Sequence, residues 1–90
     1  MPDVGAAVGT LAHETMHVAG IDDEGIAECY ALQLTAVTAR GLGARRDQAR
    51  LLQATNVEYS RKYRTGTPYD SPDCHDGGPL DLAPANARWP

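Results

Sequence analysis

The stretch that decides the fold combines two histidines, a helix break and an acidic turn, and it reads His13-Glu14-Thr15-Met16-His17-Val18-Ala19-Gly20-Ile21-Asp22-Asp23-Glu24. Residues four apart lie on the same face of an α-helix, so the rings of His13 and His17 converge on one point. Gly20 can adopt the positive φ that ends a helix, and Asp22 and Asp23 are favourable N-caps for the next helix. The stretch therefore predicts two consecutive helices, with a pair of imidazoles near the end of the first.

The pattern His-Glu-x-x-His offers two ligands and a base for a zinc ion. Zinc binds neutral imidazole nitrogen, which His13 and His17 both supply. Because a metal lowers the pKa of the water that it binds, the carboxylate of Glu14 is the expected general base. The alternative is that these residues share a solvated helix face by chance, since short motifs recur in unrelated sequences.

Helical periodicity predicts an all-α chain. The expected helices cover residues of about 3–19, 23–40 and 46–63, and no stretch is convincing as a strand. Residues 65–90 are rich in Gly, Pro, Asp and Ser, so we expect an irregular tail that belongs to the same domain as the helical core of residues 1–64.

The same periodicity assigns the faces of two of these helices. In the first expected helix, the face opposite the histidines is expected to be buried, and it consists of Val4, Val8, Leu11, Thr15 and Val18. In the third, the expected stripe consists of Leu52, Thr55, Tyr59 and Tyr63.

Composition restricts the classes of function. Of the 90 residues 42% are hydrophobic, but none is Phe and one is Trp, so we expect a thin core that a bound metal would stabilise. The net charge of -4 argues against a nucleic-acid-binding surface. The sequence contains neither an apolar run of membrane-spanning length nor a signal-peptide pattern. We therefore expect a cytoplasmic protein from the chain as written, or an exported one if it is part of a longer precursor.

Two acidic residues near the start of the second expected helix are candidates for completing the metal site. The sequence Glu24-Gly25-Ile26-Ala27-Glu28 resembles the Glu-x-x-Ala-Asp pattern of the gluzincin metallopeptidases. The resemblance implies that Glu24 is the third zinc ligand, and that Glu28 orients His13 or His17 through a hydrogen bond. Without the resemblance, both are ordinary carboxylates at the positive end of a helix dipole.

A second resemblance assigns the third ligand differently. His13-Glu14-x-x-His17-x-x-Gly20-x-x-Asp23 is similar to the metzincin pattern, including that of the snapalysins, and it implies that Asp23 is the ligand. Metzincins also place a methionine turn beneath the metal, downstream of the ligands, whereas the methionines here are Met1 and Met16. Since helix capping accounts for Asp23, we favour Glu24.

About half of the chain resembles a group of small, mostly actinobacterial proteins for which no activity is settled. The similar stretches are Leu11–Gln33 and Tyr69–Pro90. Gluzincin enzymes hold an extended peptide along a sheet edge that is built by the segment before the metal-binding helix. The residues before His13 look helical instead, and the spacer from His17 to Glu24 is shorter than is usual in gluzincins. The chain is therefore expected either to be the C-terminal part of a longer zincin or to have a metal site without this substrate-binding edge.

The two cysteines allow two states. A disulfide between Cys29 and Cys74 would hold the tail against the second helix, whereas two free thiols are the default in a cytosolic chain. We expect Cys29 to point away from the face that carries Glu24 and Glu28, which disfavours thiolate ligation of zinc.

Further residues have weaker functional signals. Gluzincins usually take a transition-state hydrogen-bond donor from a His or Tyr downstream of the ligands, and the candidates here are Tyr59, Tyr63, Tyr69 and His75. The basic run Arg61-Lys62-Arg64 is expected to be a solvated helix end.

The sequence therefore predicts a zinc-dependent, metallopeptidase-like hydrolase. His13, His17 and Glu24 hold Zn²⁺, and Glu14 activates water for attack on a peptide or similar amide bond. The expected partner is a peptide or protein substrate. The alternative is a non-catalytic, metal-stabilised helical binding module, which needs neither Glu14 nor an open coordination position.

Overall fold

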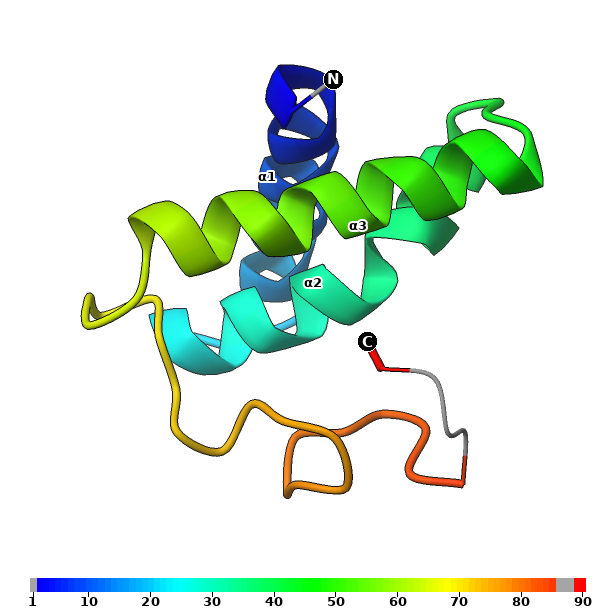
Figure 1. Cartoon of the computed structure of the whole chain (residues 1–90). Coiled ribbons are helices and arrows are strands. Elements are labelled where there is room, and N and C mark those ends of the chain that lie inside the picture. Colours follow the sequence, from blue (N-terminus) through cyan, green and yellow to red (C-terminus); the bar gives the residue numbers. More distant parts are fainter. Residues whose placement is uncertain (1, 86–88) are drawn as a thin grey trace.

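The computed structural model describes residues 2–85, 89 and 90 and contains three helices. These are α1 (Pro2–Val18), α2 (Glu24–Gly41) and α3 (Arg46–Tyr63). Within the described residues there is no strand, so the predicted all-α fold is confirmed. Each helix packs against the other two, with α1 crossing behind α2 and α3 in Figure 1. None of the described helices is both long and apolar enough to cross a membrane.

The face of α1 that is buried differs from the predicted one. Val4, Leu11 and Val18 of the predicted face are exposed, Val18 to 90%. The buried face consists of small residues and a histidine, namely Gly5, Gly9, Ala12 and His13. The prediction was wrong because it ranked the faces by side-chain hydrophobicity. The face that is buried is the one whose small residues let α1 approach its neighbouring helices most closely.

Two glycines account for that close approach. A Cβ atom on Gly5 would lie 2.8 Å from the carbonyl oxygen of Leu52 in α3, and one on Gly9 would lie 2.2 Å from the Nδ2 atom of Asn56. Both distances are shorter than the contacts that a Cβ atom makes in packed interiors. Helix α1 therefore meets α3 almost backbone to backbone, and His13, one turn after Gly9, is drawn into the interior.

The core is built from small side chains on α2. Five side chains of α2 are at most 1% exposed, namely Ala27, Cys29, Ala31, Thr35 and Ala39. The Thr35 hydroxyl accepts a hydrogen bond of 3.2 Å from the amide of Asn56, so the polar group at the centre of the core is paired. Small residues such as Ala31 and Thr35 on α2 let both other helices approach it closely.

Helix α3 has the predicted bounds but presents a different stripe. Its buried residues are Ala49, Asn56, Val57 and Ser60, whereas Tyr63 of the predicted stripe is exposed. The aromatic residues Tyr59 and Tyr63 pack on each other at the side of the core, with ring centroids 4.8 Å apart.

The tail after α3 runs back past α2 without regular structure in its described residues, as predicted (Figure 1). A disulfide joins Cys29 of α2 to Cys74, with the two Cα atoms 5.6 Å apart. Further along, the side-chain amide of Gln33 donates to the carbonyl of Leu80 at 2.9 Å and accepts from the backbone N–H of Leu82 at 2.8 Å. The tail is thus attached along one side of α2.

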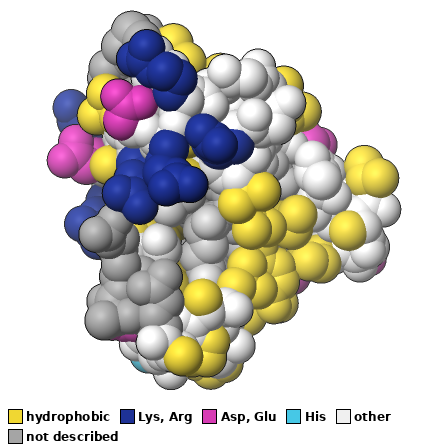
Figure 2. Space-filling view, turned by 90° about the vertical axis from the view of Figure 1, so that its right-hand side faces the viewer, with side chains coloured by type: hydrophobic (Ala, Val, Ile, Leu, Met, Phe, Trp, Pro, Cys, Tyr) yellow, Lys and Arg dark blue, Asp and Glu magenta, His cyan; other side chains and the backbone are white. Residues whose placement is uncertain are grey.

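Charge is separated along α2. Its N-terminal end follows Asp22 and Asp23 and begins with Glu24, whereas Arg40 lies in its last turn. Exposed Arg45 and Arg46 follow at the turn to α3. On the side of the molecule that includes this turn, the Lys and Arg side chains gather beside a hydrophobic patch (Figure 2). The acidic start and basic end of α2 both complement its helix dipole.

Candidate metal centre

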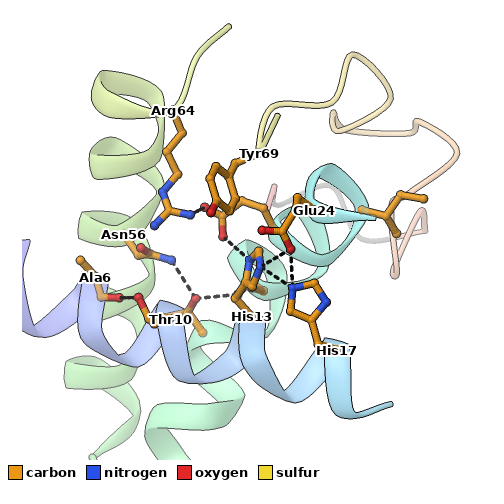
Figure 3. Close-up of polar contacts among 12 residues, drawn as sticks. Ala6, Thr10, His13, His17, Glu24, Asn56, Arg64 and Tyr69 are labelled. Carbon is orange, nitrogen blue, oxygen red and sulfur yellow. Dashed lines mark hydrogen bonds and ion pairs between the residues drawn. The ribbon is translucent and has the colours of Figure 1, made fainter. Parts of the chain in front are cut away.

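The two histidines of the motif face each other at the end of α1. His13 is buried and His17 is half-buried, and their Nε2 atoms lie 3.0 Å apart. Their rings meet edge to face, with centroids 4.7 Å apart. Figure 3 shows both rings directed toward the start of α2. The spacing of four residues therefore brings the two rings together, as the sequence predicts.

The other ring nitrogen of each histidine has an acceptor. The Nδ1 atom of His13 lies 3.3 Å from Oε1 of Glu28, and Nδ1 of His17 lies 2.7 Å from the carbonyl oxygen of Ile21. A carbonyl or carboxylate oxygen accepts and does not donate, so each Nδ1 carries the hydrogen and donates it. Both Nε2 atoms are then left as lone-pair donors toward the same point, the arrangement typical of metal-binding histidines.

Glu24 adds an oxygen to the same point. Its Oε1 atom lies 3.3 Å from Nε2 of His13 and also contacts Nε2 of His17. Glu24 is the first residue of α2, and the carboxylate of Asp23 caps that helix by accepting from the N–H of Ile26 at 2.9 Å. The structure therefore brings Glu24 to the histidines and engages Asp23 in capping.

Glu14 lies beside the same group. One of its carboxylate oxygens is within 4.8 Å of a ring nitrogen of both His13 and His17, and the three residues form a group that can hold a metal ion. Glu14 is exposed, and it lines a cavity of about 120 Å³ together with Thr10, His13, Glu24, Arg64 and Tyr69. Thus the carboxylate of Glu24 reaches the histidines from α2, and the carboxylate of Glu14 borders the cavity from α1.

Imidazole nitrogen and carboxylate oxygen are donor atoms that metal ions such as zinc accept, and two of the three separations among them are close to those expected around a tetrahedral zinc ion. Donors at the usual zinc distance and a tetrahedral angle lie about 3.3 Å apart. The separations of Nε2 of His13 from Nε2 of His17 and from Oε1 of Glu24 are 3.0 and 3.3 Å. Three acceptor atoms this close repel one another unless a cation lies among them, and that cation is either a proton or a metal ion.

The electrostatics of the group agree with this description. The hydrogen bond to the Ile21 carbonyl raises the pKa of His17, and the Glu24 carboxylate adds to this against the opposing effect of burial. Burial acts to raise the pKa of Glu24, but the hydrogen bond and charge of His13 and the charge of His17 outweigh it and lower the pKa. The metal-free group thus favours a proton held between imidazole and carboxylate.

A buried network outside this group includes a residue whose role the sequence did not indicate. Oε2 of Glu28 lies 2.8 Å from Nη1 of Arg64, and the Glu28 side chain is only 6% exposed. Arg64 had been expected in a solvated helix end, and this expectation was wrong. The available signal was Glu28 itself, because a buried carboxylate requires a cationic or hydrogen-bonding partner.

One of the four candidate hydrogen-bond donors lies at the site. The ring of Tyr69 is 5.6 Å from that of His13, and its side chain contributes to the lowered pKa of Glu24. His75 is exposed and pairs with the carbonyl of Asp76, while Tyr59 and Tyr63 line a different cavity. The tail carries Tyr69 to the site, and no spacing rule in the sequence predicts this.

Comparison with protein-family models, with curated proteins and with solved structures finds no match to this chain. The gluzincin resemblance therefore stays a prediction, and the geometry of His13, Glu14, His17 and Glu24 carries the functional argument.

Proposed function

We propose that the chain is a zinc-dependent, metallopeptidase-like hydrolase whose metal ligands are His13, His17 and Glu24. The observation that supports this most is that Nε2 of His13, Nε2 of His17 and Oε1 of Glu24 converge on one point. Each histidine ring is also held in orientation by a hydrogen bond that its Nδ1 donates. A zinc ion held by these residues would act as a Lewis acid and would lower the pKa of a water bound to it. The third ligand in the proposal is Glu24, because Asp23 is occupied as the helix cap.

In this proposal the residues of the chain handle the proton and the developing charge. The Glu14 carboxylate accepts a proton from water as the water oxygen attacks the amide carbon, and it returns the proton to the departing amine nitrogen. The Tyr69 hydroxyl borders the same cavity and is the candidate donor to the oxygen that gains charge. Both roles require a substrate amide to enter this small cavity from the exposed side of Glu14.

A comparison of two carboxylate variants tests the proposal. Native mass spectrometry should find about one zinc per chain in the wild type and in Glu14→Gln, because Glu14 is not a proposed ligand. In a peptide-library assay the wild type should cleave and Glu14→Gln should lose nearly all turnover. A wild type that stays metal-free at micromolar zinc would overturn the metal site. A zinc-loaded wild type that cleaves no better than Glu14→Gln would overturn catalysis alone.

A second candidate is a non-catalytic, metal-stabilised helical binding module. It is favoured by the absence of any strand among the described residues, since zincin enzymes hold an extended peptide along a sheet edge. In this case zinc would raise the melting temperature of the wild type and of Glu14→Gln equally, and neither would cleave.

A further inference from the structure

Arg64 connects the end of α3 to the centre of the molecule. It is the C-cap residue of α3, and its backbone N–H donates to the carbonyl of Ser60. Its side chain is 26% exposed and reaches Glu28, with Nη1 of the guanidinium 2.8 Å from Oε2 of the carboxylate. The guanidinium is always charged, so this contact between Nη1 and Oε2 holds one oxygen of the buried carboxylate in position.

The carboxylate of Glu28 is shared between this arginine and a proposed zinc ligand. Oε2 lies against Arg64, and Oε1 lies 3.3 Å from Nδ1 of His13. Because the Glu28 side chain is almost fully buried, its partners are the protein groups around it. The orientation of the His13 ring therefore depends on Glu28, whose orientation depends in turn on Arg64.

The flat face of the same guanidinium carries a second contact. The Cζ atom of Arg64 lies 4.6 Å from the ring centroid of Tyr69, within the range of a cation–π interaction. Tyr69 in turn lies beside His13, and Figure 3 shows Arg64 and Tyr69 on the same side of the histidine pair. Arg64 and Tyr69 together line both the cavity that contains Glu14 and a neighbouring one that reaches the disulfide.

We propose that Arg64 is a positioning residue that sets the His13 ring through Glu28 and places Tyr69 over the metal centre. This inference rests on the proposed zinc site. The Nη1 contact of Arg64 with Glu28 acts on His13, and the flat face of the guanidinium acts on Tyr69, the tail residue that borders the substrate cavity. A lysine would retain the charge but not the planar fork, so the two are not equivalent here.

Zinc affinity measured by chelator competition on the oxidised full chain tests this inference. Arg64→Met should weaken Zn²⁺ binding by up to the roughly 10–100-fold that follows loss of the direct partner of a ligating histidine, here Glu28, and Arg64→Lys should fall between it and the wild type. The matched control is Arg61→Met, an exposed residue three positions earlier that makes no ion pair with a described residue. Arg64→Met and Glu28→Gln should be non-additive, since they interrupt one chain of contacts.

A spectroscopic measurement separates positioning from general stability. With Co²⁺ in place of zinc, the visible absorption bands at saturation should shift in Arg64→Met and stay unchanged in Arg61→Met, because only the first alters the angle of a ligand. If Arg64→Met does not fold, Arg64→Lys against Arg61→Lys gives the same comparison.

The outcomes are distinguishable. A wild type that binds no metal overturns the zinc site and this inference together. A wild type that binds zinc, with Arg64 variants equal to their Arg61 controls in affinity and in cobalt spectrum, overturns the role of Arg64 alone.

Discussion

The Nδ1 atom of His17 lies 2.7 Å from the carbonyl oxygen of Ile21, four residues further along the chain. This hydrogen bond crosses the break between α1 and α2, at which Gly20 adopts a φ of 100°. The turn that ends the first helix therefore also orients a proposed ligand and presents Glu24 to it. Fold and site share this short segment, so changes there should affect both.

The third ligand is tested by two neighbouring substitutions. Glu24→Gln removes the charge of the oxygen that faces the histidines, and Asp23→Asn keeps the ability to cap α2. We expect the first to weaken zinc binding strongly and the second to leave it nearly unchanged, as measured by chelator competition. The reverse order would support the metzincin-like assignment of Asp23.

The pH dependence of stability should change sign when zinc is added. The pKa of His17 is raised in the folded chain, first by the Ile21 carbonyl and then by Glu24. In the metal-free protein this contribution to stability is fully present below the unfolded pKa, near 6.5, and is lost as pH rises through the higher folded pKa. Zinc requires the unprotonated ring, so in the loaded protein the stability should fall as pH decreases through the same window.

Thermal melts between about pH 5 and 8, with chelator or with excess zinc, would measure both slopes. His17→Ala is the control, and it should remove the zinc-dependent slope. Parallel slopes with and without zinc would contradict the assignment of His17 as a ligand.

The close contact of α1 with α3 predicts a cost for one added methyl group. Gly5→Ala would place a Cβ atom 2.8 Å from a backbone oxygen of Leu52, which cannot move without displacing α3. We expect a loss of about 1–3 kcal/mol in the free energy of unfolding, measured by urea denaturation. Gly41→Ala is the matched control, since a Cβ atom there would meet no other part of the described structure within 4 Å, and it should be neutral or slightly stabilising.

Removing the disulfide should loosen the tail and lower stability. The bridge between Cys29 and Cys74 spans a sequence separation of 45, for which the chain-entropy model gives about 4 kcal/mol. We expect Cys29→Ser with Cys74→Ser to reduce the melting temperature and to increase proteolysis within residues 65–85. Equal proteolysis of the two forms would mean that the contacts of Gln33 with Leu80 and Leu82 hold the tail by themselves.

The local signals in the sequence were sufficient for the helices and for the histidine pair. Gly20 and Asp23 mark the break between α1 and α2, and the bounds of α3 agree with the expected ones. Such signals depend on residues within one or two turns, where capping and φ preferences decide the outcome. The convergence of His13 and His17 follows in the same way from helix geometry alone.

The tertiary structure alone decided which face of α1 is buried and which distant residues reach the site, because both depend on contacts between separate elements. The buried face of α1 is determined by the close contact of Gly5 and Gly9 with α3. The hydrophobic periodicity of α1 alone carries no information about that contact. Arg64 and Tyr69 reach the site because the end of α3 and the tail return to the start of α2, and their sequence neighbours give no sign of this. Close packing is favourable only where the surfaces of neighbouring elements have complementary shapes. That complementarity exists only once all three helices and the tail are in place.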